Sequence, residues 1–316
     1  MYEFNSIPYI GYTMAALLNL EAYGSEKIRT ASRDVLDYMN WTYALGSYQL
    51  KHYPPMRRRY EKASITSLTT DYQSAFIKSW LSFSAIKQFD QNLQNGGEVH
   101  ALMGACMPYR PADKVVQMLF DKGDGYFVKL GHGKNSCAEI FTTGKNYLLS
   151  AGGANQGELS VVIARPTCLF LNDTVSDLSG IFHLAGPGTD FKKWNNTGVY
   201  KNFACAAGPV FVPASYKPVA QKGNWSLFTV KDDISIITFS TDSFGLMIVF
   251  ENNRIKNLLD VVITANPDET QLNTSFHFPD GKNITYDVNA PKSKWVIKSF
   301  NAVNVERDFE IWPLIE

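Results

Sequence analysis

The hydrophobic pattern of this chain changes character near residue 110. Before that point apolar residues recur every three or four positions, as in Tyr9, Tyr12, Ala16 and Leu20, which is the spacing of one face of a helix. After Gly123 the chain shows short alternating or apolar runs separated by Gly, Asn, Asp and Pro. The sequence therefore predicts an α+β fold with segregated parts: a helical part over residues 1–110 and a large antiparallel β-sandwich over residues 111–316.

The same patterns predict individual elements. Helices are expected at 8–23, 26–47, 66–92 and 111–121. Strands are expected at 126–130, 138–142, 147–151, 160–164, 180–184, 203–207, 226–230, 234–239, 245–250, 275–278, 284–288 and 295–300. The dipeptide Asp280-Gly281 predicts a hairpin turn. The segment 254–265 suits either a strand or a helix, and its apolar stripe before Pro267 favours a short helix.

Composition limits the classes of partner. The chain has 316 residues, 45% of them hydrophobic, so it can bury a large core. Its 30 Lys and Arg balance 30 Asp and Glu, which excludes a generally basic nucleic-acid binder. No run approaches the roughly 18 to 20 apolar residues that span a membrane, and residues 1–6 of the chain as given carry no signal-peptide pattern. A homo-oligomer stays open, because an exposed helical face could dimerise.

Cysteines, histidines and sequons add little chemistry. The 4 cysteines, at 106, 137, 168 and 205, form no C-x-x-C pair, so we expect buried free thiols, with one or two disulfides as the alternative. None of the 5 histidines is paired at metal-ligand spacing, and we expect no metal and no organic cofactor. Sequons at Asn40, Asn172, Asn195, Asn224, Asn273 and Asn283 are weak evidence for secretion.

A candidate site gathers at the helix ends of the N-terminal part. Asn5 stands before the first helix, His52 follows the second, and Arg57-Arg58-Arg59-Tyr60 follows Pro54-Pro55. In an antiparallel helical pair these ends lie on one rim. Guanidinium groups there bind carboxylate or sulfate, and a Tyr or His beside them can abstract a proton, which are the parts that β-elimination from a uronic acid needs. The structural alternative stays open: Asn5 as an N-cap, His52 as a dipole partner and the arginines as a solvated loop.

The order of these residues is similar to a known family. The stretch Glu3-Phe4-Asn5-Ser6-Ile7-Pro8-Tyr9, then Val35-Leu36-Asp37 and Ala44-Leu45-Gly46-Ser47, then the Arg-Arg-Tyr loop, resembles the last part of the helical toroid in polysaccharide lyases. These are the heparinase II/III-like, alginate-lyase-like and hyaluronate-lyase-like proteins, which pair an (α/α) toroid with a C-terminal β-sandwich. The resemblance implies that residues 1–110 are the end of a larger helical toroid.

The resemblance also implies roles and a setting. Asn5 would neutralise the uronate carboxylate, His52 or Tyr60 would act as base and acid, and Arg58 would hold the acid group or orient Tyr60. Tyr9, Arg57 and Arg59 would bind the substrate, an acidic polysaccharide or oligosaccharide, in a periplasmic or extracellular location. The alternatives are a non-catalytic carbohydrate-binding or surface protein whose aromatic grooves hold glycans, and an inactive fragment of a lyase or glycoside hydrolase. The 13% aromatic content suits both a packed core and such grooves and does not decide between them.

Overall fold

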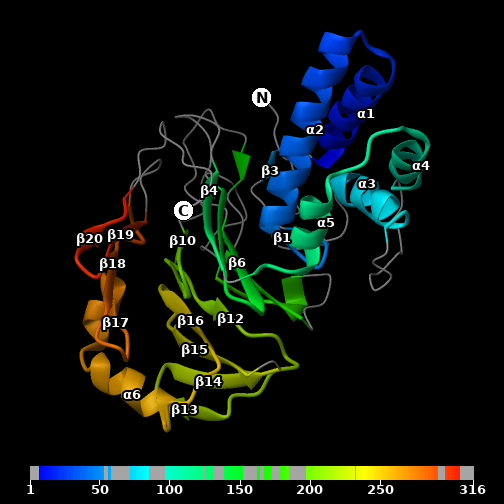
Figure 1. The fold of residues 1–316 in the computed structure, drawn as a ribbon. Coiled ribbons are helices and arrows are strands. Elements are labelled where there is room, and N and C mark those ends of the chain that lie inside the picture. Colours follow the sequence, from blue (N-terminus) through cyan, green and yellow to red (C-terminus); the bar gives the residue numbers. More distant parts are fainter. Residues whose placement is uncertain are drawn as a thin grey trace.

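A computed structural model describes residues 7–52, 56–57, 72–84, 97–123, 125–130, 139–151, 162–163, 167–172, 178–184, 197–231, 233–290 and 296–306. Within these ranges the helices of the N-terminal part come first and antiparallel sheets follow, which confirms the α+β prediction (Figure 1). The described helices are α1 (Ile7–Tyr23), α2 (Glu26–Gly46), α3 (Tyr72–Leu81), α4 (Glu98–Cys106), α5 (Asp113–Phe120) and α6 (Leu258–Ala265), with short 3-10 turns η2 (Leu178–Gly180) and η3 (Glu269–Asn273).

Three larger sheets follow the helices, and all their described pairings are antiparallel. The helix-side sheet has the order β12-β9-β8-β6-β5-β4, built from β4 (Phe127–Leu130), β5 (Glu139–Thr143), β6 (Tyr147–Ala151), β8 (Thr167–Leu171), β9 (Phe182–Leu184) and β12 (Val210–Phe211). The middle sheet has the order β10-β11-β16-β15-β14-β13, built from β10 (Thr197–Tyr200), β11 (Phe203–Ala206), β13 (Ala220–Lys222), β14 (Trp225–Val230), β15 (Ile234–Ser240) and β16 (Gly245–Glu251).

The C-terminal sheet contains β17 (Ser275–His277), β18 (Asn283–Tyr286), β19 (Ile297–Phe300) and β20 (Val303–Asn304) in that order. Two small strand pairs complete the description: β1 (Ser47–Tyr48) with β2 (Lys51–His52), and β3 (Met56–Arg57) with β7 (Val162–Ile163). The turn at Asp280-Gly281 joins β17 to β18 as predicted, and Gly281 has the positive φ of 82° that favours glycine there.

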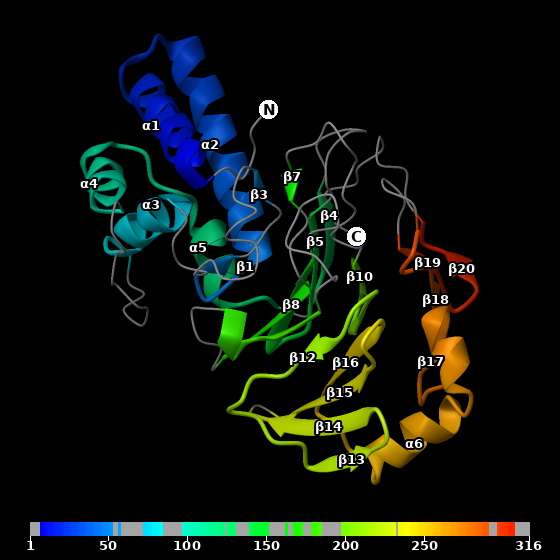
Figure 2. The ribbon, with the colours of Figure 1, turned by 180° about the vertical axis from the view of Figure 1, so that it is seen from behind.

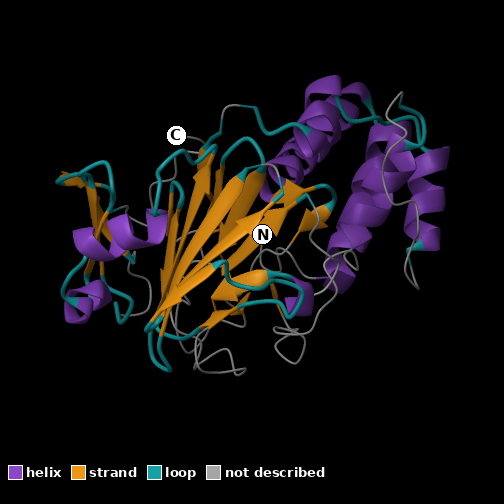
Figure 3. Ribbon diagram, turned by 90° about the horizontal axis from the view of Figure 1, so that it is seen from below, coloured by secondary structure: helices purple, strands orange, loops and turns teal. Residues whose placement is uncertain are grey.

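The helix-side sheet lies next to the N-terminal helices, the middle sheet follows it, and the C-terminal sheet and α6 lie on the far side of the middle sheet (Figures 1 to 3). Phe182 of the helix-side sheet packs edge-on against Phe228 of the middle sheet, with ring centroids 5.2 Å apart. On the other side of the middle sheet, Phe203 packs against Tyr286 of the C-terminal sheet, with ring centroids 5.2 Å apart. One continuous hydrophobic core runs through all three sheets. The middle sheet is therefore covered by another sheet on each side.

The helix-side sheet is also buried on both faces. Ile140, Leu149 and Leu169 belong to the core shared with the middle sheet. Their chain neighbours Phe141, Leu148 and Phe170 form a separate cluster with Leu45 and Tyr48 at the end of α2. Because successive residues of a strand face opposite ways, all five positions of β5, β6 and β8 are buried. The helices are thus joined to the sheets through the outer face of this sheet.

The helices have a core of their own, in which α5 packs against α2. The buried face of α1 consists of Ile10, Met14 and Leu18, whereas the apolar stripe that identified this helix in the sequence lies outside. Tyr9, Tyr12 and Leu20 are 44%, 68% and 46% exposed. α1 is thus apolar on two faces, and its one acidic residue, Glu21, is buried in an ion pair with Arg33.

The remaining sequence predictions divide into those met and those not. Cys168 and Cys205 are buried and in no disulfide, as expected; Cys106 is also in no disulfide but is exposed, and Cys137 lies outside the described residues. The sequon residue Asn40 is fully buried and its amide donates to Tyr109 Oη at 3.1 Å, so it cannot carry a glycan in this fold. In the described part of the chain, no helix is long and apolar enough to cross a membrane.

The close approach of α2 to the helix-side sheet makes a prediction at Gly46. A Cβ atom on Gly46 would stand 2.5 Å from Cζ of Phe141, which is itself fully buried. Gly46→Ala should therefore lower the free energy of unfolding by about 1 to 3 kcal/mol, because the ring must move in a packed core. Urea unfolding followed by tryptophan fluorescence measures this. Phe141→Leu in the Gly46→Ala background should recover part of the loss, and a variant as stable as the parent would contradict the contact.

Candidate functional site

The structure describes part of the site predicted from the sequence. His52 ends β2, Tyr9 lies in the first turns of α1, and the backbone of Arg57 in β3 pairs with Val162 of β7. Asn5, Arg58, Arg59 and Tyr60 lie outside the described residues. Their convergence with His52 on one polar surface therefore stays a prediction.

The arrangement of the first two helices fits the shared rim that the prediction needs. Only Gly24-Ser25 separates α1 from α2, and the two helices pack against each other in opposite directions (Figure 1). The beginning of α1 and the end of α2 thus lie at the same end of the pair. His52 follows the end of α2 by six residues and Tyr9 follows the beginning of α1 by two.

His52 belongs to a short β-hairpin, residues 47–52, with an unusual two-residue turn. Ser47 pairs with His52 and Tyr48 with Lys51, which leaves Gln49 and Leu50 as the turn. Both turn residues have positive φ, 48° and 64°, the conformation of a type I′ turn. Asn-Gly is the usual sequence there, and a left-handed conformation costs other residues about 1 to 2 kcal/mol each. The surroundings must hold this turn in place.

Contacts from two directions fix the hairpin. Leu50 is buried in the helical core, and its carbonyl accepts a hydrogen bond from Tyr43 Oη at 3.3 Å. On the other side Asn172, which follows β8, accepts with Oδ1 from Gln49 Nε2 at 2.7 Å and from Tyr48 Oη at 2.9 Å. The hairpin is therefore tied both to the helices and to the helix-side sheet, so the position of His52 is fixed relative to each.

The His52 ring lies in an aromatic setting and is 8% exposed. Its centroid is 4.7 Å from that of Tyr43 and 6.4 Å from that of Phe141. Two rings at these distances restrict how the imidazole can turn. Tyr9, in contrast, is 44% exposed and its ring is 6.5 Å from that of Tyr12.

Side chains from the segment after α5 complete the end of α2. Lys122 is buried, and its Nζ donates to the carbonyls of Ala44 at 2.6 Å and Met118 at 2.7 Å, in the last turns of α2 and α5. Tyr126 Oη donates to the next carbonyl of α2, that of Leu45. These bonds satisfy carbonyls that a helix end leaves without intrahelical partners. Burial lowers the pKa of Lys122 to about 7, because the charged ammonium loses its water.

Sequence reasoning missed most of the residues that hold this hairpin. Tyr48 and Gln49 are 124 and 123 residues from Asn172, so no local pattern links them. The turn also lacks the Gly or Asn that marks a hairpin in a sequence. Asn172 stood out only as a sequon. Lys122 had no visible signal, since a lysine is rarely buried.

No metal site accompanies the hairpin in the part of the chain that the structure describes. There, no three or more His, Cys, Asp or Glu side chains are grouped so that they could hold a metal ion. Comparison of the chain with protein-family models, with curated proteins and with solved structures finds no match.

Proposed function

We propose that this protein is a carbohydrate-active protein that cleaves an acidic, uronic-acid-containing polysaccharide by β-elimination. The reaction would take place beside the hairpin of residues 47–52, where the helices meet the helix-side sheet. That the helices are the end of an (α/α) toroid, and that the protein works in a periplasmic or extracellular setting, are parts of the same proposal.

The observation that carries the proposal is the anchoring of His52. A general base must be held within hydrogen-bond reach of the proton that it removes, and a strained turn tied to two parts of the fold provides such a rigid support. His52 ends the second strand of a hairpin whose turn has two left-handed residues, and this hairpin is bonded to α2 through Tyr43 and to the helix-side sheet through Asn172. The order of helices followed by antiparallel sheets also agrees with the lyase resemblance.

The proposed roles follow the chemistry of elimination. His52 removes the proton from the carbon next to the uronate carboxylate, while Asn5 hydrogen-bonds that carboxylate and stabilises the developing charge. Tyr60, oriented by Arg58, returns a proton to the glycosidic oxygen as its bond to the ring breaks. A carbon–carbon double bond conjugated with the carboxylate remains. Tyr9, Arg57 and Arg59 hold the neighbouring sugar residues, and no organic cofactor takes part.

A second candidate function is non-catalytic carbohydrate binding. It is favoured by the exposed tyrosines along α1, where Tyr9, Tyr12 and Tyr23 are 44%, 68% and 79% exposed. Aromatic rings offer flat surfaces for sugar stacking. The small exposure of His52 agrees with this candidate as well.

Incubation of the folded protein with alginate, heparin, hyaluronan and pectate distinguishes the two functions. We expect a rise in the ultraviolet absorbance of the conjugated double bond with at least one of these polymers. Affinity electrophoresis in gels that contain the same polymers reports binding separately. Retarded migration with no rise in absorbance for any polymer would remove the lyase proposal and support the binding function.

A further inference from the structure

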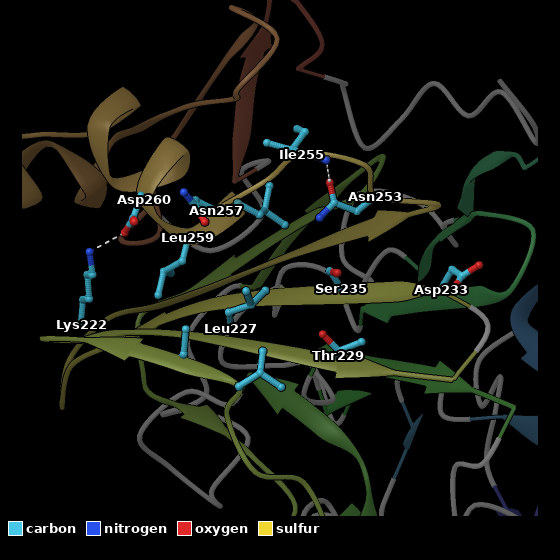
Figure 4. Close-up of a pocket in the computed structure, with 13 residues that line it drawn as sticks. Lys222, Leu227, Thr229, Asp233, Ser235, Asn253, Ile255, Asn257, Leu259 and Asp260 are labelled. Carbon is cyan, nitrogen blue, oxygen red and sulfur yellow. Dashed lines mark hydrogen bonds and ion pairs between the residues drawn. The ribbon is translucent and has the colours of Figure 1, made fainter.

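A pocket lies far from the N-terminal helices, on the side of the middle sheet that faces α6. It has a volume of about 510 Å³, and its floor contains Leu227 and Thr229 of β14 and Ser235 of β15 (Figure 4). Its walls come from the edge strand β13 with the preceding Val219, and from Asn257 and the first turn of α6. A volume between about 300 and 1,000 Å³ is typical of sites for small molecules.

The floor of the pocket changes from apolar to polar along one face of the sheet. Trp225 pairs with Phe239, Leu227 with Ile237 and Thr229 with Ser235, so these six side chains share one face. The first pair is covered by the segment of η3, where Glu269 accepts a hydrogen bond from Trp225 Nε1 at 3.1 Å. The hydroxyl pair falls at the far end of this row, inside the pocket. The sequence thus places two hydroxyl groups at the end of the row that the C-terminal sheet does not cover, and these groups line the pocket.

Several hydrogen-bonding groups of the pocket are uncommitted. The side chains of Thr229, Ser235 and Asn257 form no hydrogen bond within the described part of the chain. Asn257 stands at the N-cap of α6 but has a left-handed backbone, φ 53°, and its side chain makes no capping bond. Hydroxyl and amide groups both donate and accept hydrogen bonds, so together they suit a ligand that carries hydroxyl groups.

The charges in the pocket argue against an anionic ligand. Lys222 is paired with Asp260, with Nζ and Oδ1 2.5 Å apart, so its charge is compensated. Asp233, also in the lining, adds a second carboxylate. The lining therefore has one more acidic than basic group, and Figure 4 shows the ion pair and Asp233 at opposite ends of the pocket. A carboxylate or phosphate would be repelled, since none of the described lining residues is an unpaired cation.

We propose that this pocket binds a neutral saccharide unit. The aliphatic side chains of Leu227, Val219 and Ile255 offer apolar surface to the C–H groups of a sugar ring, and the hydroxyl and amide groups bind its hydroxyls. A purely apolar ligand fits less well, because it would leave the Thr229 and Ser235 hydroxyls without water or partners. This site is separate from the hairpin of His52 and does not depend on the elimination chemistry.

Two-dimensional ¹H–¹⁵N NMR of the full chain tests the site with methyl glycosides of glucose, galactose and mannose. We expect saturable shifts of the backbone amides in 227–235 and 253–260 with at least one glycoside, with a dissociation constant on the order of 1 mM. Thr229→Val and Ser235→Ala should each weaken binding by about 2- to 12-fold, the range for one hydrogen bond. Ser226→Ala, on the opposite face of β14, is the matched control and should leave the affinity unchanged.

The charge argument is tested with glucuronate as the second probe. Glucuronate should bind more weakly than the neutral glycoside, and Asp233→Asn should narrow that difference. Absence of shifts in these segments with all three glycosides would overturn the proposal, as would equal affinity for glucuronate or equal weakening by Ser226→Ala. Leu227→Trp, which fills the pocket, should abolish the shifts. The absorbance assay of the elimination reaction is unaffected by these outcomes, so the two proposals fail separately.

Discussion

Replacing His52 by glutamine should lower the elimination rate on the best polymer by about 100- to 10,000-fold, the usual contribution of a positioned acid or base. Glutamine keeps a polar side chain of similar reach but has no nitrogen that accepts a proton. Because His52 lies between Tyr43 and Phe141 and not on the exposed stripe of α1, binding of the polymer should change little. The measurement is the initial rate of the absorbance rise together with polymer affinity.

The control for this variant is His277→Gln. His277 is exposed and ends β17 in the C-terminal sheet, so its replacement should leave the rate unchanged. The urea unfolding curve of His52→Gln shows whether the hairpin has kept its packing. An unchanged rate in a folded His52→Gln variant would exclude His52 as the base, while loss of affinity with an unchanged turnover rate would assign it to substrate binding.

Lys122 should give the protein a stability that rises with alkaline pH. Burial lowers its pKa to about 7 in the folded state from the ordinary lysine value of 10.5, so between these two pH values the unfolded chain binds more protons. The free energy of unfolding therefore increases from about pH 7 to pH 10.5, and this gain is lost as the pH falls back through 7. With about 1.4 kcal/mol for each pKa unit, the increase is at most about 5 kcal/mol.

Lys122→Met removes this pH dependence. The neutral amine of lysine still has two N–H donors for the carbonyls of Ala44 and Met118, whereas methionine has none. The variant should therefore be the less stable protein at pH 10 and should lose much of this disadvantage at pH 6, in urea unfolding at each pH. Lys217→Met, at an exposed position, is the control. If the difference in unfolding free energy between Lys122→Met and the parent did not vary with pH, the lowered pKa of Lys122 would be contradicted.

Much of the secondary structure could be predicted from the sequence because it rests on local pattern. The first two helices and the strand at 147–151 agree with the structure to within one residue, and the short helix before Pro267 is confirmed as α6. Helix α4 was missed, since its apolar residues Val99 and Leu102 lie outside and give no core-facing stripe. Strand β8 was also missed, and its five buried positions show no alternation.

The candidate site was predictable only as far as it follows chain order. His52 could be placed after a helix, but the sequence suggested a polar rim shared by the helix ends, whereas the ring is mostly buried beside Tyr43. The left-handed turn at Gln49 and Leu50 contradicts local preference and exists because distant groups, above all Asn172, stabilise it. Such long-range compensation cannot be recovered from spacing in one sequence.

The two-sided burial of the helix-side sheet affects how its strands find their partners. In a sheet with one solvent-exposed face, a register shift of one residue would turn the apolar side chains of a strand toward water. The free-energy cost of that exposure selects the correct register. β5, β6 and β8 have no solvent-exposed face, so a register shift would expose few apolar side chains to water and would cost little free energy in this way. Their register must instead be selected by the fit of side chains of different size and by specific contacts that hold one strand in place. Glu251 supplies one, because its carboxylate accepts the backbone N–H groups of Lys145 and Asn146 in the turn between β5 and β6.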